Sequence, residues 1–97
     1  MLRRTFTPRF NRELETKKRE GYNMEQFKEV VHFITHEEPL PEAFKEHLLH
    51  EEWAGYTECH IEDDWLLIYK INKMKKTVVF HRTGSHSELF THWHQED

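Results

Sequence analysis

Four side chains of this 97-residue chain combine the groups that RNA cleavage requires: His60, Asp64, Arg82 and His86. Histidine exchanges protons near neutral pH, so an imidazole suits general acid or base work. The guanidinium of arginine matches the geometry of a phosphate. Transesterification needs a base for the ribose 2′-OH, a cation at the phosphorane and an acid at the departing 5′-oxygen. This scheme requires no metal ion and no cofactor.

The predicted strands explain how these side chains can meet. Residues 54–61 alternate weakly between polar and apolar, 65–71 are nearly all apolar, and 77–82 are β-branched and aromatic. Consecutive strands with short links pair as an antiparallel meander. The end of the first strand, the start of the second and the end of the third then share one edge of the sheet. Trp65 and Phe90 flank this edge and can stack on unpaired bases.

The predicted elements follow the order β-α-α-β-β-β along the chain, which indicates an α+β fold. Residues 3–6 form a short strand, and Thr7 with Pro8 begins a helix that ends near Gly21. Asn23 caps a second helix, whose apolar residues recur at helical spacing. We expect both helices to pack on one face of an antiparallel sheet.

The remaining segments complete a single domain over residues 1–97. The polar segment PEAFKEHLLHEEW, before the first meander strand, is expected to be partly helical. Ser85 can cap a short C-terminal helical turn over HSELF. Residues 91–97 are expected to form a flexible tail.

The composition fits a cytoplasmic protein. No apolar run approaches the roughly 20 residues of a membrane span, and the basic N-terminus lacks the apolar region of a signal peptide. The single cysteine, Cys59, excludes an internal disulfide and fits a reducing compartment. The formal net charge is −4, but residues 1–21 and 70–82 are net basic, which leaves room for a local anion-binding surface.

Each of these features also has a purely structural explanation. A pair such as Asp63-Asp64 before a strand is common turn chemistry. Arg82 can pair with Glu58 or Asp64, and Trp65 can belong to the core. Structural ion-pair networks also gather charged groups, so the convergence at one edge is what favours a functional site.

Two longer stretches, EEWAGYTECHIEDDWLLIYKI and HRTGSHSELF, resemble the YafQ branch of the RelE/ParE superfamily of bacterial toxins. The preceding EPLPEAFKEH, residues 38–47, resembles the matching segment of that branch. The likeness is dense from about Pro39 to Phe90, whereas the N-terminal third agrees in pattern only. The resemblance implies the compact RelE-like fold, which agrees with the order of elements predicted above.

The resemblance also implies a function, that of a ribosome-dependent mRNA endoribonuclease in a type II toxin–antitoxin system. The implied partners are the ribosome, mRNA and a small cognate antitoxin, often in a complex of two toxins and two antitoxins. The residues implied to line the cleavage site are His47, His60, Asp64, Trp65, Arg82, His86 and Phe90.

The roles of these residues are a hypothesis at this point. Proton transfer is assigned to Asp64 or a neighbouring histidine as base and to His86 as acid. The other site residues bind substrate or orient their neighbours: Arg82 holds the phosphate, Trp65 and Phe90 contact nucleobases, and His47 and His60 assist.

Two expectations concern single positions. The meander by itself puts His47 near the opposite end of the sheet, so only a loop that folds back would bring it to the site. Asp63 stands where a proline is frequent in the resembling sequences. Its charge is expected to raise the pKa of Asp64 by repulsion.

Three other functions are compatible with the sequence. His92 and His94 offer two metal ligands near the C-terminus, although no cysteine or ligand motif supports them. A ParE-like relative would share the fold, lack the catalytic set and inhibit DNA gyrase. A decayed toxin would only bind its antitoxin. In that case the basic residues 8–20 would face an acidic partner, whereas in an active toxin they can meet rRNA phosphates.

Overall fold

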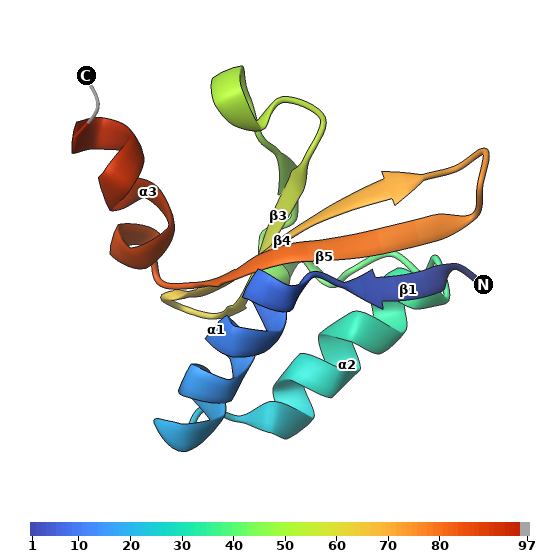
Figure 1. The fold of residues 1–97 in the computed structure, drawn as a ribbon. Helices are drawn as coiled ribbons and strands as arrows, with labels where there is room; N and C mark the ends of the chain where they lie inside the picture. The colour runs from blue at the N-terminus through green and yellow to red at the C-terminus, as the bar shows by residue number, and fades with distance from the viewer. Residues whose placement is uncertain (96–97) are drawn as a thin grey trace.

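The helices and strands follow the predicted order, with additional short elements in the middle of the chain (Figure 1). The computed structural model describes residues 1–95, and side-chain surroundings for residues 1–90. The elements are β1 (Arg3–Phe6), α1 (Pro8–Arg19), α2 (Met24–Thr35), the 3₁₀ turn η1 (Glu42–Phe44), β2 (His47–Leu48), the 3₁₀ turn η2 (Glu51–Trp53), β3 (Thr57–Glu62), β4 (Trp65–Asn72), β5 (Thr77–Gly84) and α3 (His86–Gln95).

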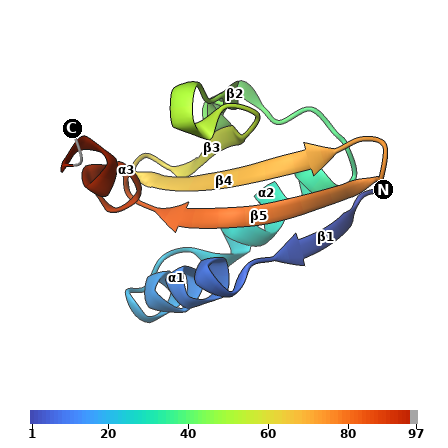
Figure 2. The same cartoon turned by 45° about the horizontal axis from the view of Figure 1, so that its top comes forward.

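The five strands form one sheet with the order β1-β5-β4-β3-β2, and Figure 2 shows β3, β4, β5 and β1 side by side. Strands β3, β4 and β5 pair antiparallel, as the meander predicts, and β2, which the sequence does not predict, pairs antiparallel with β3. The prediction of an antiparallel sheet is wrong for β1, which pairs parallel with β5. Both helices and the strands β2 to β4 lie between β1 and β5 in the chain, so no hairpin sets the direction of β1.

The two N-terminal helices begin at the predicted caps. The hydroxyl oxygen of Thr7 accepts the N–H of Phe10 at the start of α1, and the Asn23 side chain accepts the N–H of Gln26 at the start of α2. These bonds satisfy backbone donors that have no partner inside the helix. Gly21, directly after α1, has φ of 88°, a conformation that costs glycine little.

Both helices cover one face of the sheet, and the apolar core lies between them and the strands (Figure 1). Phe10 of α1 and Val30 of α2 have no exposed surface, and their partners across the core come from alternate positions of the strands. Such alternation is expected of a sheet packed on one face. The strand residues of this core are Cys59, Ile61, Trp65, Leu67, Tyr69, Val78 and Phe80.

The opposite face of the sheet, which we call the outer face, carries a smaller apolar cluster. Leu66 and Ile68 of β4 pack there against Leu89 of α3. The segment around η2 and α3 covers this face only in part (Figure 1). Polar side chains of the strands are therefore accessible there.

The C-terminal helix is longer than the short turn that the sequence predicts, because α3 runs to Gln95. Ser85 caps it as predicted: its hydroxyl oxygen accepts the N–H of Glu88. Among the described residues, no helix is both long and apolar enough to cross a membrane.

Tyr69 provides a test of how the core supports the segment before β2. Its hydroxyl donates to Oε2 of Glu46, and burial, together with the nearby Cys59 and Glu46, raises the pKa of Tyr69 above its ordinary value of 10.0. Tyr69→Phe should lower the free energy of unfolding at pH 7 by about 1 kcal/mol, the net contribution of one such hydrogen bond.

The same substitution should change the alkaline limb of the stability curve. The folded-state pKa exceeds the unfolded one, so this contribution is complete below pH 10 and is lost as the pH rises further. Above that pH the wild-type protein should lose stability faster than Tyr69→Phe. Urea denaturation between pH 7 and pH 11 measures the difference, and parallel curves would contradict it.

Candidate active site

A row of paired residues crosses the outer face of the sheet. His47 of β2 lies opposite Glu58 of β3, Glu58 opposite Ile68 of β4, and Ile68 opposite Arg82 of β5. The expectation that His47 lies at the far end of the sheet is therefore wrong. A strand of only two residues, β2, runs antiparallel to β3 and brings His47 in. So short a strand leaves no periodic pattern to detect.

The imidazole of His47, which belongs to this row, lies near those of His60 and His86. The ring centroids of His47 and His60 are 6.5 Å apart, and those of His60 and His86 are 5.5 Å apart. The meander thus brings His60, Asp64 and His86 together, as the sequence predicts, because the turn after β3 and the end of β5 share this edge.

Glu58 is a site residue that the sequence analysis considered only as an ion-pair partner of Arg82. It is 3% exposed, and its Oε1 lies 3.1 Å from Nε2 of His47 and 3.8 Å from Nε2 of His60. A buried carboxylate requires such compensation. The spacing between Glu58 and His60 could have indicated this role from the sequence, because residues 58 and 60 of one strand lie on the same face of the sheet.

The Nδ1 atoms of His47 and His60 donate to backbone carbonyl oxygens. Nδ1 of His47 lies 2.9 Å from the carbonyl oxygen of Lys45, and Nδ1 of His60 lies 3.2 Å from that of Asp63. A carbonyl oxygen only accepts, so each Nδ1 is the donor. The Nε2 atoms of both rings lie on the side of Glu58. These contacts fix the orientation of both rings toward the buried carboxylate.

Asp64 orients His86. Its Oδ1 accepts the backbone N–H of His86 at 3.0 Å and lies 3.0 Å from Nδ1 of the same residue. The ring of His86 therefore carries its proton on Nδ1 and turns Nε2 away from Asp64. Phe90, one turn further along α3, has its ring centroid 6.3 Å from that of His86 and is half-buried.

The charge state of Asp64 differs from the expectation. Hydrogen bonds from the backbone and side chain of His86 lower the pKa of Asp64 and outweigh its slight desolvation, with a further contribution from the charge of Lys17. The predicted increase through Asp63 is therefore wrong, because two donors of His86 outweigh the neighbouring charge. Asp64 is ionised at neutral pH and is a weak base.

Arg82 pairs with a residue that the sequence did not indicate. Its Nε and Nη2 lie 2.8 and 2.6 Å from Oε2 of Glu13 on α1, and the other oxygen of Glu13 accepts the N–H of Thr83. Neither Glu58 nor Asp64 is the partner. Arg82 is 9% exposed. Its contact with Glu13 joins β5 to α1.

Trp65 lies away from the outer face. Its ring has no exposed surface and packs against Tyr22 and Phe27 on the helix side. Its Nε1–H donates to the hydroxyl oxygen of Thr83 at 2.8 Å. A fully buried indole cannot stack on a nucleobase, so the expected substrate contact through Trp65 has no basis in this conformation.

The cluster also contains a set of possible metal ligands. Among the described residues, one ligand atom each from Glu58, His60 and His86 lies within 4.8 Å of the other two. Nitrogen and oxygen donors of this kind suit zinc or copper. The side chains of His92 and His94, the alternative metal ligands from the sequence, lie outside the described side chains.

The matches with known proteins extend over most of the chain. A family model described as "Bacterial toxin of type II toxin-antitoxin system, YafQ" matches residues 2–91. The chain is similar to the mRNA interferase toxin YafQ of Escherichia coli strain B / BL21-DE3, with 33% identity over 86 residues, which cover 88% of this chain and 91% of that protein.

Two solved structures are similar over almost the whole chain. A copper-bound mutant toxin from Helicobacter pylori has a TM-score of 0.88 at 31% identity, covering 93% of this chain and 100% of that one. A chain of the E. coli DinJ-YafQ complex has a TM-score of 0.83 at 32% identity, covering 93% and 99%.

The adjacent carboxylates Asp63 and Asp64 allow a matched test of the site geometry. Asp64→Ala removes the oxygen that accepts from both the backbone N–H and the Nδ1 of His86, so the amide proton of His86 should exchange several-fold faster with solvent. Asp63→Ala removes the same charge one residue away and should leave this exchange unchanged, since only its backbone carbonyl contacts the site. NMR measurement of amide hydrogen exchange distinguishes the two variants. Equal exchange rates of the His86 amide in both variants would contradict the role given to Asp64.

Proposed function

The chain belongs to the YafQ family of bacterial toxins from type II toxin–antitoxin systems, and from this premise we propose that it is a ribosome-dependent mRNA endoribonuclease. It cuts by attack of a ribose 2′-OH on the adjacent phosphate, without a metal ion. The observation that carries the proposal is the cluster of three imidazoles, two of them beside the carboxylate of Glu58 and the third held by Asp64, on the open face of the sheet.

His86 is the acid of this reaction. Asp64 holds its Nδ1 and fixes the direction of the ring. Nε2 is then the nitrogen that can deliver a proton to the departing 5′-oxygen. The side chain of His86 is 57% exposed, so an RNA strand can reach it.

His47, in its protonated form, supplies the positive charge at the scissile phosphate. Its Nδ1 donates to the carbonyl oxygen of Lys45, and its Nε2 lies 3.1 Å from Oε1 of Glu58. A fixed cation near the phosphorane lowers the barrier because it needs no reorganisation during the reaction. Arg82 was the first choice for this role, but Glu13 compensates its charge, and we assign it to the support of β5.

The base is the pair of Glu58 and His60, which can share one proton. Asp64 is unsuited because its pKa is lowered and a weak base accepts a proton poorly. Phe90 stands next to His86 and is placed to position a nucleobase by stacking.

The partners follow from the same family membership. A relative of known structure is a complex of the toxin YafQ with DinJ, and we infer that this chain is likewise neutralised by an antitoxin, as a complex of two toxins and two antitoxins. The basic positions of α1, such as Arg12 and Lys18, are exposed and suit either an acidic antitoxin segment or rRNA phosphates.

A metal ion would compete with this reaction. Zinc or copper at Glu58, His60 and His86 would occupy the nitrogens that carry protons in this scheme. The copper-bound relative from H. pylori is compatible with such competition.

The alternative is a binding protein of the same fold without nuclease activity, either an inhibitor of gyrase or a toxin that only sequesters its antitoxin. The convergence of His60, Asp64 and His86 disfavours it, because a pure binding surface has no need for this arrangement. Inhibition of supercoiling by a protein that leaves mRNA intact would favour the alternative.

The roles of His86 and Glu58 can be separated from folding. His86→Ala and Glu58→Gln should each reduce cleavage of ribosome-bound mRNA by about 10²–10⁴-fold, the usual contribution of a general acid or base. His50→Ala, an exposed histidine after β2, should cleave like the wild type. Primer extension on translated mRNA measures the cuts, and antitoxin binding verifies the fold. A fully active His86→Ala would remove His86 from the mechanism.

The nucleophile can be tested on the substrate. A single deoxyribose at the scissile position removes the 2′-OH and should block cleavage, whereas a chelator selective for zinc and copper, which leaves the magnesium of the ribosome in place, should leave the rate unchanged. Added zinc should inhibit. Cleavage of the deoxy-substituted substrate, or loss of activity with the chelator, would refute metal-independent transesterification.

A further inference from the structure

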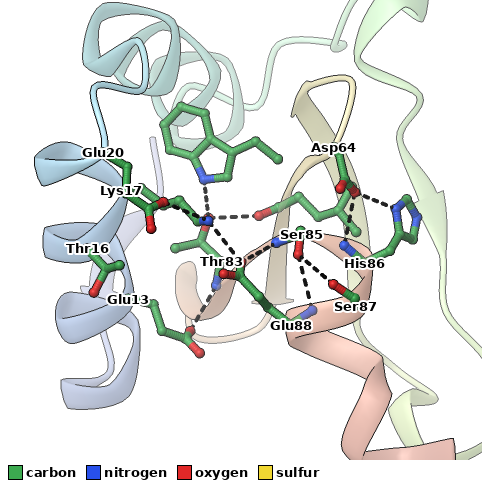
Figure 3. A network of polar contacts seen from close by, with 12 residues as sticks. Glu13, Thr16, Lys17, Glu20, Asp64, Thr83, Ser85, His86, Ser87 and Glu88 are labelled. Atoms are coloured by element: carbon green, nitrogen blue, oxygen red, sulfur yellow. Dashed lines mark hydrogen bonds and ion pairs between the residues drawn. The ribbon is translucent and has the colours of Figure 1, made fainter.

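Lys17 is a buried lysine that the proposed reaction does not use. Its side chain is 5% exposed, and its Nζ lies 2.9 Å from Oε1 of Glu88 and 3.2 Å from Oε1 of Glu20 (Figure 3). Burial alone lowers the pKa of Lys17, but the hydrogen bonds to Glu88 and Glu20 outweigh it and raise the pKa above 10.5. A buried lysine is rare unless it is paired, so this cation has a fixed position.

Glu88 connects this lysine to the first turn of α3. The oxygen that meets Lys17 also accepts the N–H of Ser85 at 2.7 Å, and the N–H of Glu88 donates to the hydroxyl of Ser85 at 3.1 Å. This reciprocal arrangement is a capping box. A Cβ on Gly84 would come within 2.9 Å of the same oxygen. The carboxylate is therefore held against the turn that ends β5.

The next residue after Ser85 is His86, the proposed acid. Both its backbone N–H and its Nδ1 contact Asp64, so the direction of its ring depends on where α3 begins. The charge of Lys17 also reaches Asp64 and contributes to lowering its pKa. Figure 3 shows the continuous path from α1 through Glu88 and Ser85 to His86.

Two apolar side chains of this turn contact the sheet. Leu89 is buried within the outer-face cluster, and Phe90 packs against it partly buried. An open cleft of about 220 Å³ lies beside Lys17, lined also by Thr16, Thr83 and Glu88. The ion pair between Lys17 and Glu88 joins α1 to α3 beside this cleft.

We propose that Lys17 and Glu88 are positioning residues of the active site. Their contact fixes the first turn of α3 on α1, and it thereby holds the imidazole of His86 against Asp64 in the orientation that the reaction uses. The expected effect on the cleavage rate rests on the proposed function. The expected effect on the orientation of His86 rests on the contacts alone. Neither side chain is proposed to touch RNA.

Lys17→Met is the direct test, because it keeps an apolar stem and removes the cation. The exposed Lys28 of α2 provides the control, since Lys28→Met makes the same change on a helix that the proposed function assigns to no partner. Lys17→Met should reduce kcat on ribosome-bound mRNA about 10- to 100-fold, the effect of misplacing a catalytic group. KM and antitoxin affinity should stay at the wild-type values. Lys28→Met should retain the wild-type kcat.

A signal from His86 itself separates positioning from a general loss of stability. In folded Lys17→Met, the amide of His86 should exchange faster and the ¹⁵N shifts of its ring should change at constant pH. The same signals in Lys28→Met should match the wild type. Wild-type His86 signals in Lys17→Met would overturn the inference, whether or not kcat falls.

Glu88→Gln provides a second route if Lys17→Met does not fold. The amide oxygen still accepts the N–H of Ser85, but the charge that meets Lys17 is absent. The double variant should lose no more kcat than the more affected single variant, because both changes remove one contact. Additive losses would overturn the inference. A wild-type protein that cuts no RNA would refute the proposed function, while the His86 signals would still decide whether Lys17 positions this ring.

Discussion

Burial of charge is the constraint on which this structure depends. Among the described residues, the buried charged side chains are Lys17, Glu58 and Arg82, and each is paired with a group from a different element of the fold. Taking an ion out of water costs several kcal/mol unless a partner and further hydrogen bonds compensate it. These pairs are therefore obligatory, and each fixes the relative position of two elements.

The two faces of the sheet are organised by different forces as a result. On the helix side, aromatic and aliphatic side chains fill the space and determine how α1 and α2 lie. On the outer face the apolar cluster is small, and the buried carboxylate of Glu58 gathers His47 and His60 around itself. A reactive surface needs such an arrangement, because groups that exchange protons must be both accessible and held in place.

The meander and its shared edge could be predicted from the sequence because period-2 patterns and short links determine strand pairing. That logic correctly joined His60, Asp64 and His86. It failed for His47, whose strand has two residues, and for the direction of β1, which no hairpin constrains. Side-chain partners were harder to predict than strands. The partner of Arg82 is Glu13, 69 positions away in the chain, and this contact exists only after α1 has docked on the sheet.

The acidic total charge is compatible with action on a phosphate. The formal net charge of −4 counts all nine histidines as neutral, and three of them, His47, His60 and His86, lie near one another at the site. A proton bound to any of these imidazoles adds one positive charge that the formal count omits. Glu58, counted as a full negative charge, faces both rings and is compensated within the cluster. The field that an approaching phosphate meets is set by these neighbours within a few ångströms, since distant surface charges are screened by salt over roughly 8–10 Å.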